Sequence, residues 1–226
     1  MKILVACEYS GRVRDALIKQ GHDAISCDFN DTETPGPHYK GDLMDVIHKP
    51  WDGLIAHPAC TYLSSSGLHW NSRGTLVNGR PRAELTEEAV KFARMFIDGP
   101  ETAHIPRRAV ENPIGCLSTL VRKPDQIIHP HQFGDDASKA TCLWLSNLPL
   151  LKPTTQIAPR YICQDCFNTG DSPTCADCGS KYHLKRWANQ DHSGQNNLPD
   201  TKGRWKVRSR TYQGIADAIA TQWFKS

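Results

Sequence analysis

The chain has 226 residues, a formal net charge of +3 and a sequence pI of about 8.4, with 38% hydrophobic and 23% charged residues. These values are typical of a soluble globular protein, and the mild positive charge is compatible with nucleic-acid binding without indicating it. The absence of any run of about 18 apolar residues excludes a membrane-spanning helix, and the first residues turn polar too soon for a signal peptide. We therefore expect a cytoplasmic monomer that does not bind membranes, built from one α/β domain or from one domain with a small module.

Apolar runs and amphipathic stretches alternate along the first half of the chain. Strands are predicted at residues 2–7, 22–29, 51–60 and 107–115, and helices at residues 13–20, 86–97 and, near the C-terminus, 210–226. The segment 30–41 is predicted to be a loop from its composition, and Thr86 is placed to cap the helix that follows it. This alternation predicts the α/β class with a doubly wound, Rossmann-like sheet.

Polar side chains stand at the carboxyl ends of the predicted strands. Glu8, Asp28, Cys60 and Glu111 each end or follow an apolar run. In doubly wound sheets the carboxyl ends of the strands form the edge at which ligands bind. We therefore expect these four side chains to converge on one cleft.

The composition changes after Pro149, where aliphatic residues become few and Gly, Pro, Asn and Asp become frequent. Such a segment builds little core by itself. It carries two Cys-x-x-Cys pairs separated by eight residues, Cys163 with Cys166 and Cys175 with Cys178, which is a pattern typical of a tetrahedral zinc site. Because four cysteines leave no open position for a reactive water, the Zn²⁺ is predicted to be structural.

Two alternatives stay open for these cysteines. They could be redox dithiols, against which speaks the lack of a thioredoxin-like context, and His183 or His192 could be a ligand if one cysteine is not used. Basic and aromatic residues interleave in the segment that follows, a composition found on nucleic-acid-binding surfaces and also on ordinary solvated faces. The basic residues concerned are Lys185, Arg186, Arg204, Arg208 and Arg210.

One apolar run ends in a lone cysteine, Cys60, followed by small polar residues. A scattered cysteine is most often a small buried packing residue. Pro58 stiffens the approach to this one, and the serines after it supply hydrogen-bond donors to a ligand. Glu111 ends another apolar strand and suits a general acid, because burial raises the pKa of a carboxyl group; an ion pair with Arg107 or Arg108 is the alternative.

Together these motifs resemble those of the DNA cytosine-5 methyltransferases. The stretch PACTYLSSSG, with Cys60, Ser64 and Gly67, is similar to the Pro-Pro-Cys-Gln…Ser-x-x-Gly loop of that family, and VENPIG is similar to its Glu-Asn-Val motif. YSGRVRDAL stands where the family has its glycine-rich cofactor turn, and GDLMD resembles its Gly-Asp-Ile motif. The motifs follow the family's order over roughly residues 1–150 and 207–224, and the chain also resembles the short members of the family that phages carry.

The resemblance implies S-adenosylmethionine as cofactor, double-stranded DNA as partner and a role for each motif. Cys60 would be the nucleophile, with Glu111 and Asn112 completing the catalytic set. Asp28 would hold the ribose hydroxyls and Asp42 the adenine amine. The full cofactor-binding set implied is Glu8, Tyr9, Ser10, Gly11, Arg12, Asp28, Asp42, Leu43 and Pro58. Residues 1–150 and 207–226 would form the methyltransferase domain, and residues 151–206 the zinc-ribbon target-recognition region.

The sequence departs from the family at several positions. Ala59 and Thr61 replace the usual Pro and Gln beside the cysteine, the cofactor turn has a single glycine, and no Gln-x-Arg-x-Arg motif is evident. Lys139 and Thr141 are predicted to take the place of that motif. Together with Ser64 and the basic residues named above, they form the predicted nucleic-acid set.

The reaction that the resemblance implies fits these residues. Addition of the Cys60 thiolate to cytosine C6 would make C5 reactive toward the sulfonium methyl group, and a nearby cation, Arg82 or Arg107, would favour the thiolate. The target base must first leave the duplex stack. Two other hypotheses stay open: a non-catalytic zinc-ribbon DNA-binding protein on a degenerate methyltransferase scaffold, and a related enzyme that acts on RNA or a nucleotide.

Overall fold

The computed structural model describes residues 1–170, 172–198 and 203–224. Its centre is a seven-stranded sheet with the order β3-β2-β1-β4-β7-β9-β8. In chain order these strands are β1 Lys2–Ala6, β2 Asp23–Asp28, β3 His38–Lys40, β4 Gly53–Ala56, β7 Arg107–Pro113, β8 Gln126–Ile128 and β9 Thr141–Ser146. The prediction of a doubly wound α/β sheet is confirmed.

The sheet is parallel from β3 to β7 and antiparallel at its other edge. β1 pairs in parallel with both β2 and β4, and β4 pairs in parallel with β7. β9 runs antiparallel to β7 and β8. Because the chain winds first to one side of β1 and then to the other, the carboxyl ends of β1 and β4 flank the point at which ligands bind in such sheets.

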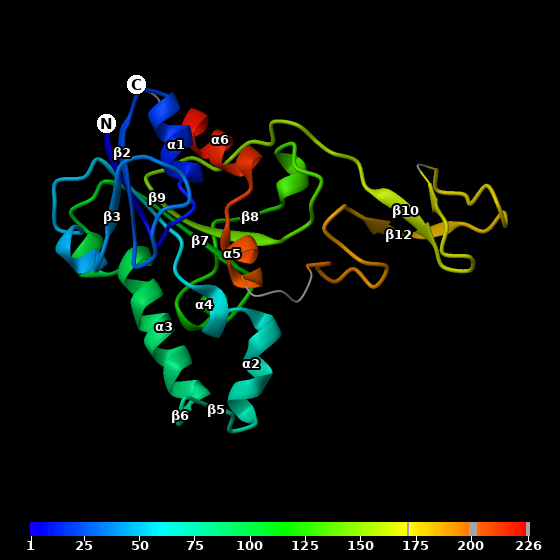
Figure 1. Cartoon of the computed structure of the whole chain (residues 1–226), viewed down its shortest axis with the longest axis horizontal. Coiled ribbons are helices and arrows are strands. Elements are labelled where there is room, and N and C mark those ends of the chain that lie inside the picture. Colours follow the sequence, from blue (N-terminus) through cyan, green and yellow to red (C-terminus); the bar gives the residue numbers. More distant parts are fainter. Residues whose placement is uncertain (171, 199–202, 225–226) are drawn as a thin grey trace.

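Two helices far apart in the sequence cover one face of this sheet side by side (Figure 1). They are α1 Arg12–Lys19 and α6 Gln213–Gln222. Ile215, Ile219 and Trp223 are buried in a single core with residues of β1 and α1. The last helix therefore packs against the α/β body.

The opposite face is covered by α3 Arg82–Ile97, whose Phe96 is fully buried in a second core. This helix begins at Arg82, so the prediction that Thr86 caps its start was wrong. Thr86 lies inside the helix, buried, and its hydroxyl donates to the carbonyls of Tyr62 and Arg82 at 3.2 and 3.1 Å. The N-cap position is held by Pro81, and the polar residues after it belong to the first turn.

The segment 30–41 was predicted to be a loop, and this prediction was wrong for residues 38–40. Its last residues form β3, which pairs in parallel with β2. Tyr39 contributes to the second core. Three residues are too short a stretch to show the alternation that predicts a strand.

Shorter elements join these strands and helices. They are η1 Leu43–Asp45, η2 Cys60–Tyr62, α2 Ser65–Ser72, the hairpin β5 Leu76–Val77 and β6 Arg80–Pro81, η3 Pro100–Thr102, α4 Leu117–Leu120 and η4 Pro130–Gln132. Helix α2 was not predicted because it has no buried residue and so no apolar periodicity.

A small three-stranded antiparallel sheet projects from this body (Figure 1). It is formed by β10 Arg160–Cys163, β11 Thr169–Gly170 and β12 Tyr182–Arg186. After β12 the chain returns to the body, where the ring of Trp187 stacks on that of His131 with centroids 4.3 Å apart. We call residues 160–186 the ribbon.

Helix α5 Arg204–Ser209 precedes α6 and lies across the predicted boundary between residues 206 and 207. The division of the chain into a methyltransferase domain and a target-recognition region stays a prediction.

Candidate active site and metal centre

The loop that carries Cys60 is fastened at three successive points to the end of β7 and the segment that follows it. The Nδ1 atom of His57 lies 3.0 Å from Oε2 of Glu111. The amide of Asn112 donates to the carbonyl of Pro58 at 2.6 Å. Further on, the backbone N–H of Cys116 donates to the carbonyl of Leu63 at 2.9 Å. The two motifs that the sequence singled out are thus one structural unit, held by side-chain contacts between residues 54 positions apart.

The third contact requires a glycine. Ser64 and Gly115 form an isolated antiparallel bridge, and the N–H of Ser65 donates to the carbonyl of Ile114 at 2.9 Å. A Cβ atom on Gly115 would collide with the carbonyl group of Leu63. The glycine of VENPIG therefore permits the close backbone approach that holds the cysteine loop.

Glu111 is paired with a histidine and not with either of the arginines considered as alternatives. The side chains of His57 and Glu111 are only 7% and 13% exposed. Burial by itself would raise the pKa of Glu111, but the hydrogen bond from His57 and the positive charge of Lys139 more than offset it, so the pKa lies below its ordinary value. The prediction that burial would raise this pKa toward neutrality was wrong.

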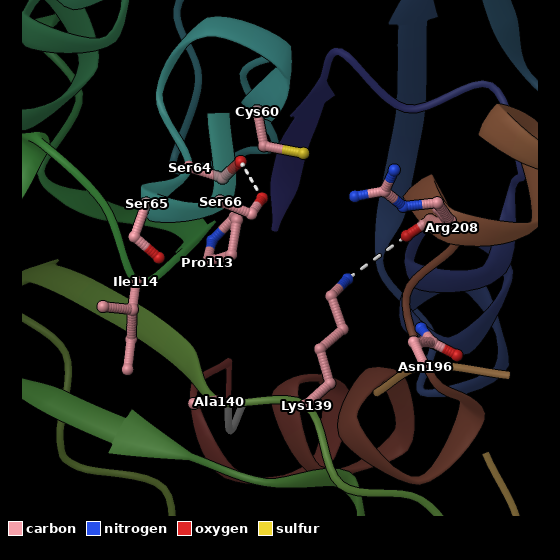
Figure 2. A pocket seen from close by; sticks show the side chains of 10 residues that line it. All are labelled: Cys60, Ser64, Ser65, Ser66, Pro113, Ile114, Lys139, Ala140, Asn196 and Arg208. Atoms are coloured by element: carbon pink, nitrogen blue, oxygen red, sulfur yellow. Dashed lines mark hydrogen bonds between the residues drawn. The ribbon is translucent and has the colours of Figure 1, made fainter. Parts of the chain in front are cut away.

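Cys60 is half-buried and opens onto a cavity of about 240 Å³ (Figure 2). Ser64, Ser65 and Ser66 line one side of it, with Pro113 and Ile114, and Lys139 and Arg208 approach from the other. The ammonium group of Lys139 donates to the carbonyl of Arg208 at 3.3 Å. Drug-sized ligands occupy pockets of about 300–1,000 Å³, so this cavity suits a group of the size of a single base.

Of the two cations considered as partners for the cysteine, only Arg82 contacts its loop. Its guanidinium donates to the carbonyl of Thr61 at 2.8 Å and lies 4.9 Å from the ring centre of Tyr62. Arg107 begins β7, at the opposite end of that strand from Glu111, and contacts the sulfur of Met1.

The turn after β1 is closed by its own acidic side chain. Glu8 is buried, and its carboxylate accepts from the backbone N–H of Val13 at 2.8 Å and of Arg14 at 3.3 Å and from the Ser10 hydroxyl at 3.1 Å. It therefore satisfies two of the N–H groups in the first turn of α1 that have no partner within the helix. Gly11 adopts a φ of 74° at the N-cap of this helix, a conformation that glycine adopts without strain.

Two other residues of this turn bind the C-terminal segment. The Tyr9 hydroxyl donates to the carbonyl of Lys206 at 2.6 Å, and its ring packs against Trp205 with centroids 5.6 Å apart. Arg12 donates to the carbonyl of Thr211 at 2.9 Å. In this structure Tyr9 and Arg12 thus hold α5 and α6 over the turn, and their assignment to the cofactor stays a prediction.

The acids at the end of β2 and the start of η1 lie close together. Asp28 ends β2, and Asp42 caps η1 by accepting from the N–H of Met44 at 2.9 Å. Burial and the nearby charges of Asp28, Asp42 and Asp45 raise the pKa of Cys27 to about 11. The next residue after Asp28, Phe29, is 73% exposed. It was missed in the sequence, where an aromatic at a strand end reads as core.

The predicted nucleic-acid residues do not form one surface. Ser64, Lys139 and Arg208 line the cavity at Cys60. Thr141 is buried and its hydroxyl donates to the carbonyl of Lys139 at 3.3 Å, so it supports Lys139 and does not face a ligand.

The remaining basic residues lie on other elements. Arg210 forms a bidentate ion pair with Glu33, in which its guanidinium nitrogens donate to the two carboxylate oxygens at 2.7 and 2.8 Å. Lys185 and Arg186 end β12, where Lys185 lies over the ring of Tyr161 and Arg186 donates to the carbonyl of His192. Arg204 begins α5.

The four cysteines of the ribbon come together as the spacing predicted. The sulfur atoms of Cys163, Cys166, Cys175 and Cys178 all lie within 4.8 Å of one another, with the closest pairs 3.4 and 3.5 Å apart. Four sulfurs at about 2.3 Å from a zinc ion would stand about 3.8 Å apart, so the cluster fits a tetrahedral Zn²⁺.

Among the residues with described side chains, no histidine joins this cluster. His192 instead lies parallel to the ring of Phe167, with centroids 6.0 Å apart. The side chain of His183 is outside the part of the structure that is described.

Within residues 1–170, 172–198 and 203–224, none of the helices has the length and apolar character needed to span a lipid bilayer.

No protein-family model matches this sequence, and no curated protein is similar to it. Two solved structures show a partial likeness. One, from E. coli, is described as a DNA modification methyltransferase encoded within a prophage (TM-score 0.42, 12% identity, 70% of this chain and 52% of the other). The other is a mutant form of DNMT2 from Spodoptera frugiperda (TM-score 0.41, 16% identity, 69% of this chain and 54% of the other). The chain spans about half the length of each, and the fold and site described above depend on neither.

Proposed function

We propose that this chain is an S-adenosylmethionine-dependent DNA cytosine-5 methyltransferase with Cys60 as its nucleophile. The observation that carries the proposal is the fastening of the Cys60 loop at three points: His57 to Glu111, Pro58 to Asn112 and Leu63 to Cys116. A loop whose only task was to pack a cysteine would not need a buried acid on one side and a cavity on the other.

The half-buried Cys60 is placed for addition to a base in the cavity. Its thiolate would form a bond to cytosine C6, and the electron pair of the C5–C6 bond would then be available at C5 for methyl transfer. Loss of the C5 proton and of Cys60 would restore the ring. Asn112 holds the carbonyl of Pro58, two residues before the nucleophile, and so limits the motion of the loop.

The cofactor would bind at the carboxyl ends of β1 and β2, beside the loop. Asp28 and Asp42 are the acids that suit its ribose hydroxyls and adenine amine, and the exposed ring of Phe29 offers an apolar surface for a purine. Bound S-adenosylmethionine would supply the methyl group. These two carboxylates fit the cofactor's chemistry because they accept hydrogen bonds from hydroxyl and amine groups.

DNA would approach the side of the cavity where Lys139 and Arg208 lie. These cations, from the loop before β9 and from α5, suit the phosphates that flank a base turned out of the duplex. The zinc-loaded ribbon, with Lys185 and Arg186 on β12, would extend the contact along the duplex. Double-stranded DNA is therefore the proposed partner.

The test is to incubate the protein with mixed-sequence duplex DNA and S-adenosylmethionine, digest the DNA to nucleosides and detect 5-methylcytosine by mass spectrometry. The wild type is expected to form it, and Cys60→Ser to lose at least about 10³-fold in rate. A Cys116→Ser variant, altered at another cysteine outside the cavity, controls for loss of a thiol. Intact DNA binding without modified cytosine would contradict the proposal.

The packing of the turn after β1 favours a second function, a DNA-binding protein without transferase activity. Groups of the chain itself already occupy this turn, where the family's cofactor would bind. Glu8 already occupies the N–H groups at the start of α1, and Thr34 of the loop after β2 packs so closely on Gly11 that a Cβ atom there would collide with it. Calorimetric titration with S-adenosylmethionine decides between the two. Binding supports the enzyme, and DNA binding without cofactor binding supports the second function.

A further inference from the structure

The proposed reaction assigns no role to His57, although this residue is part of the site. It follows β4 directly and precedes Pro58. Its imidazole is 93% shielded from solvent, and its Nδ1 atom lies 3.0 Å from Oε2 of Glu111. Because a carboxylate only accepts hydrogen bonds, Nδ1 is the donor of this pair when Glu111 is ionised.

The other nitrogen of the imidazole is unbonded among the residues that the structure describes. Nε2 of His57 is buried and makes no hydrogen bond within the described residues. Leaving a buried nitrogen without a partner is unfavourable, so an apolar side chain would serve packing better at this position. The unbonded Nε2 atom indicates that the role of His57 lies in the hydrogen bond that its Nδ1 atom makes to Glu111.

The groups that face Glu111 come from three directions. His57 approaches from the end of β4, Lys139 acts from the loop before β9, and Cys142 lies on β9 itself. His57 and Lys139 lower the pKa of the carboxyl group, and Glu111 in turn contributes to a raised pKa of Cys142, after burial. Only Oε2 of Glu111 is bonded within the described residues, which leaves Oε1 for a ligand.

We propose that His57 is a positioning residue: by donating from Nδ1 to Oε2 it fixes the orientation of the Glu111 carboxylate and presents Oε1 to the target base. This inference rests on the proposed function, because the base is the cytosine of that reaction. A fixed carboxylate oxygen would accept from the exocyclic amine of cytosine. Without His57 the carboxyl group would be free to rotate and, being buried, would take up a proton more readily.

The test compares His57→Ala with His57→Asn. The side-chain nitrogen of asparagine can stand where Nδ1 of histidine stands, so His57→Asn keeps the donor and loses the ring. We expect His57→Ala to lose about 10- to 100-fold in kcat with little change in KM for DNA, by analogy with the loss seen when the partner that orients a metal-ligating side chain is removed. His57→Asn should recover most of that loss. His104→Asn, an exposed histidine remote from Cys60, is the matched control.

A second readout does not depend on activity. The titration of the Glu111 carboxyl carbon, followed by ¹³C NMR and assigned with Glu111→Gln, should move to higher pH in His57→Ala. If the wild type methylates cytosine and His57→Ala does so at the same kcat, or if the titration of Glu111 is unchanged, the inference is overturned while the proposed function stands. If the wild type does not methylate, the proposed function fails, and the titration alone still supports or overturns the His57–Glu111 coupling.

Discussion

Two cysteine sites in this chain differ in what surrounds the sulfur. Cys60 stands alone, half-buried, beside a cavity lined by serines and approached by Lys139 and Arg208. The four cysteines of the ribbon face one another, with all their sulfurs within 4.8 Å of one another, close enough to share one metal ion. The first site has an open side for a reactant, and the second has none.

Under the proposed function, the same residue type serves chemistry at one site and structure at the other. Around Cys60 the protein provides rigid backbone anchors at Pro58 and Leu63, which hold the loop while leaving the thiol free. In the ribbon the cysteines are themselves the anchors, because few other residues there are buried. Removal of sulfur should therefore abolish a reaction at one site and a fold at the other.

The largest structural effect is expected at the proposed zinc site. Chelation of the metal, or Cys178→Ser, which replaces an exposed ligand, should unfold residues 156–205 because structural zinc contributes about 10–16 kcal/mol in such modules. Limited proteolysis should then cut within this segment, and DNA affinity should fall about tenfold or more while cofactor affinity changes little. Unchanged DNA binding after verified loss of the metal would contradict this prediction.

A smaller effect is expected from loosening the cysteine loop. Asn112→Ala removes the buried hydrogen bond to the Pro58 carbonyl, so the free energy of unfolding in urea should fall by about 1–3 kcal/mol. Asn147→Gly is the matched control: it removes an amide-to-carbonyl bond to Pro106 that is exposed, and glycine keeps the φ of 53° found at Asn147. Equal losses in the two variants would show that burial of the anchor is not what matters.

The smallest effect is a pH dependence of stability from Glu111. Its pKa in the folded protein lies below the ordinary 4.5, so its ionised form stabilises the fold above about pH 4.5, and this contribution is lost as the pH falls through the lowered value. The difference in the free energy of unfolding between the wild type and Glu111→Gln should therefore shrink on acidification. A difference that stays constant from pH 7 to pH 3 would contradict the assignment.

Much of the site was predictable because parallel strands end at a common edge. Cys60 follows β4, and Glu111 lies near the end of β7, the next strand in the sheet. Two apolar runs with polar ends were enough to bring them together, and the spacing of two Cys-x-x-Cys pairs was enough to predict the ribbon's metal cluster.

Other parts depend on contacts that no local pattern records. The role of Glu8 in closing its turn, the ion pair of Arg210 with Glu33 and the packing of Tyr9 on Trp205 each depend on the final tertiary arrangement. The pKa of Glu111 was predicted in the wrong direction because burial was considered without its partner. His57 is three residues before Cys60 in the sequence, but only the structure shows that it faces Glu111.

The most direct test of the central claim is covalent trapping at Cys60. Duplex DNA that carries 5-fluorocytosine is incubated with the protein and S-adenosylmethionine, and the product is analysed by intact mass and by peptide mapping. Because fluorine at C5 cannot leave as the proton does, the account predicts a stable protein–DNA adduct that carries one added methyl group, maps to Cys60 and is absent in Cys60→Ser. Bound DNA without an adduct, or an equal adduct in Cys60→Ser, would contradict the assignment of Cys60 as the nucleophile.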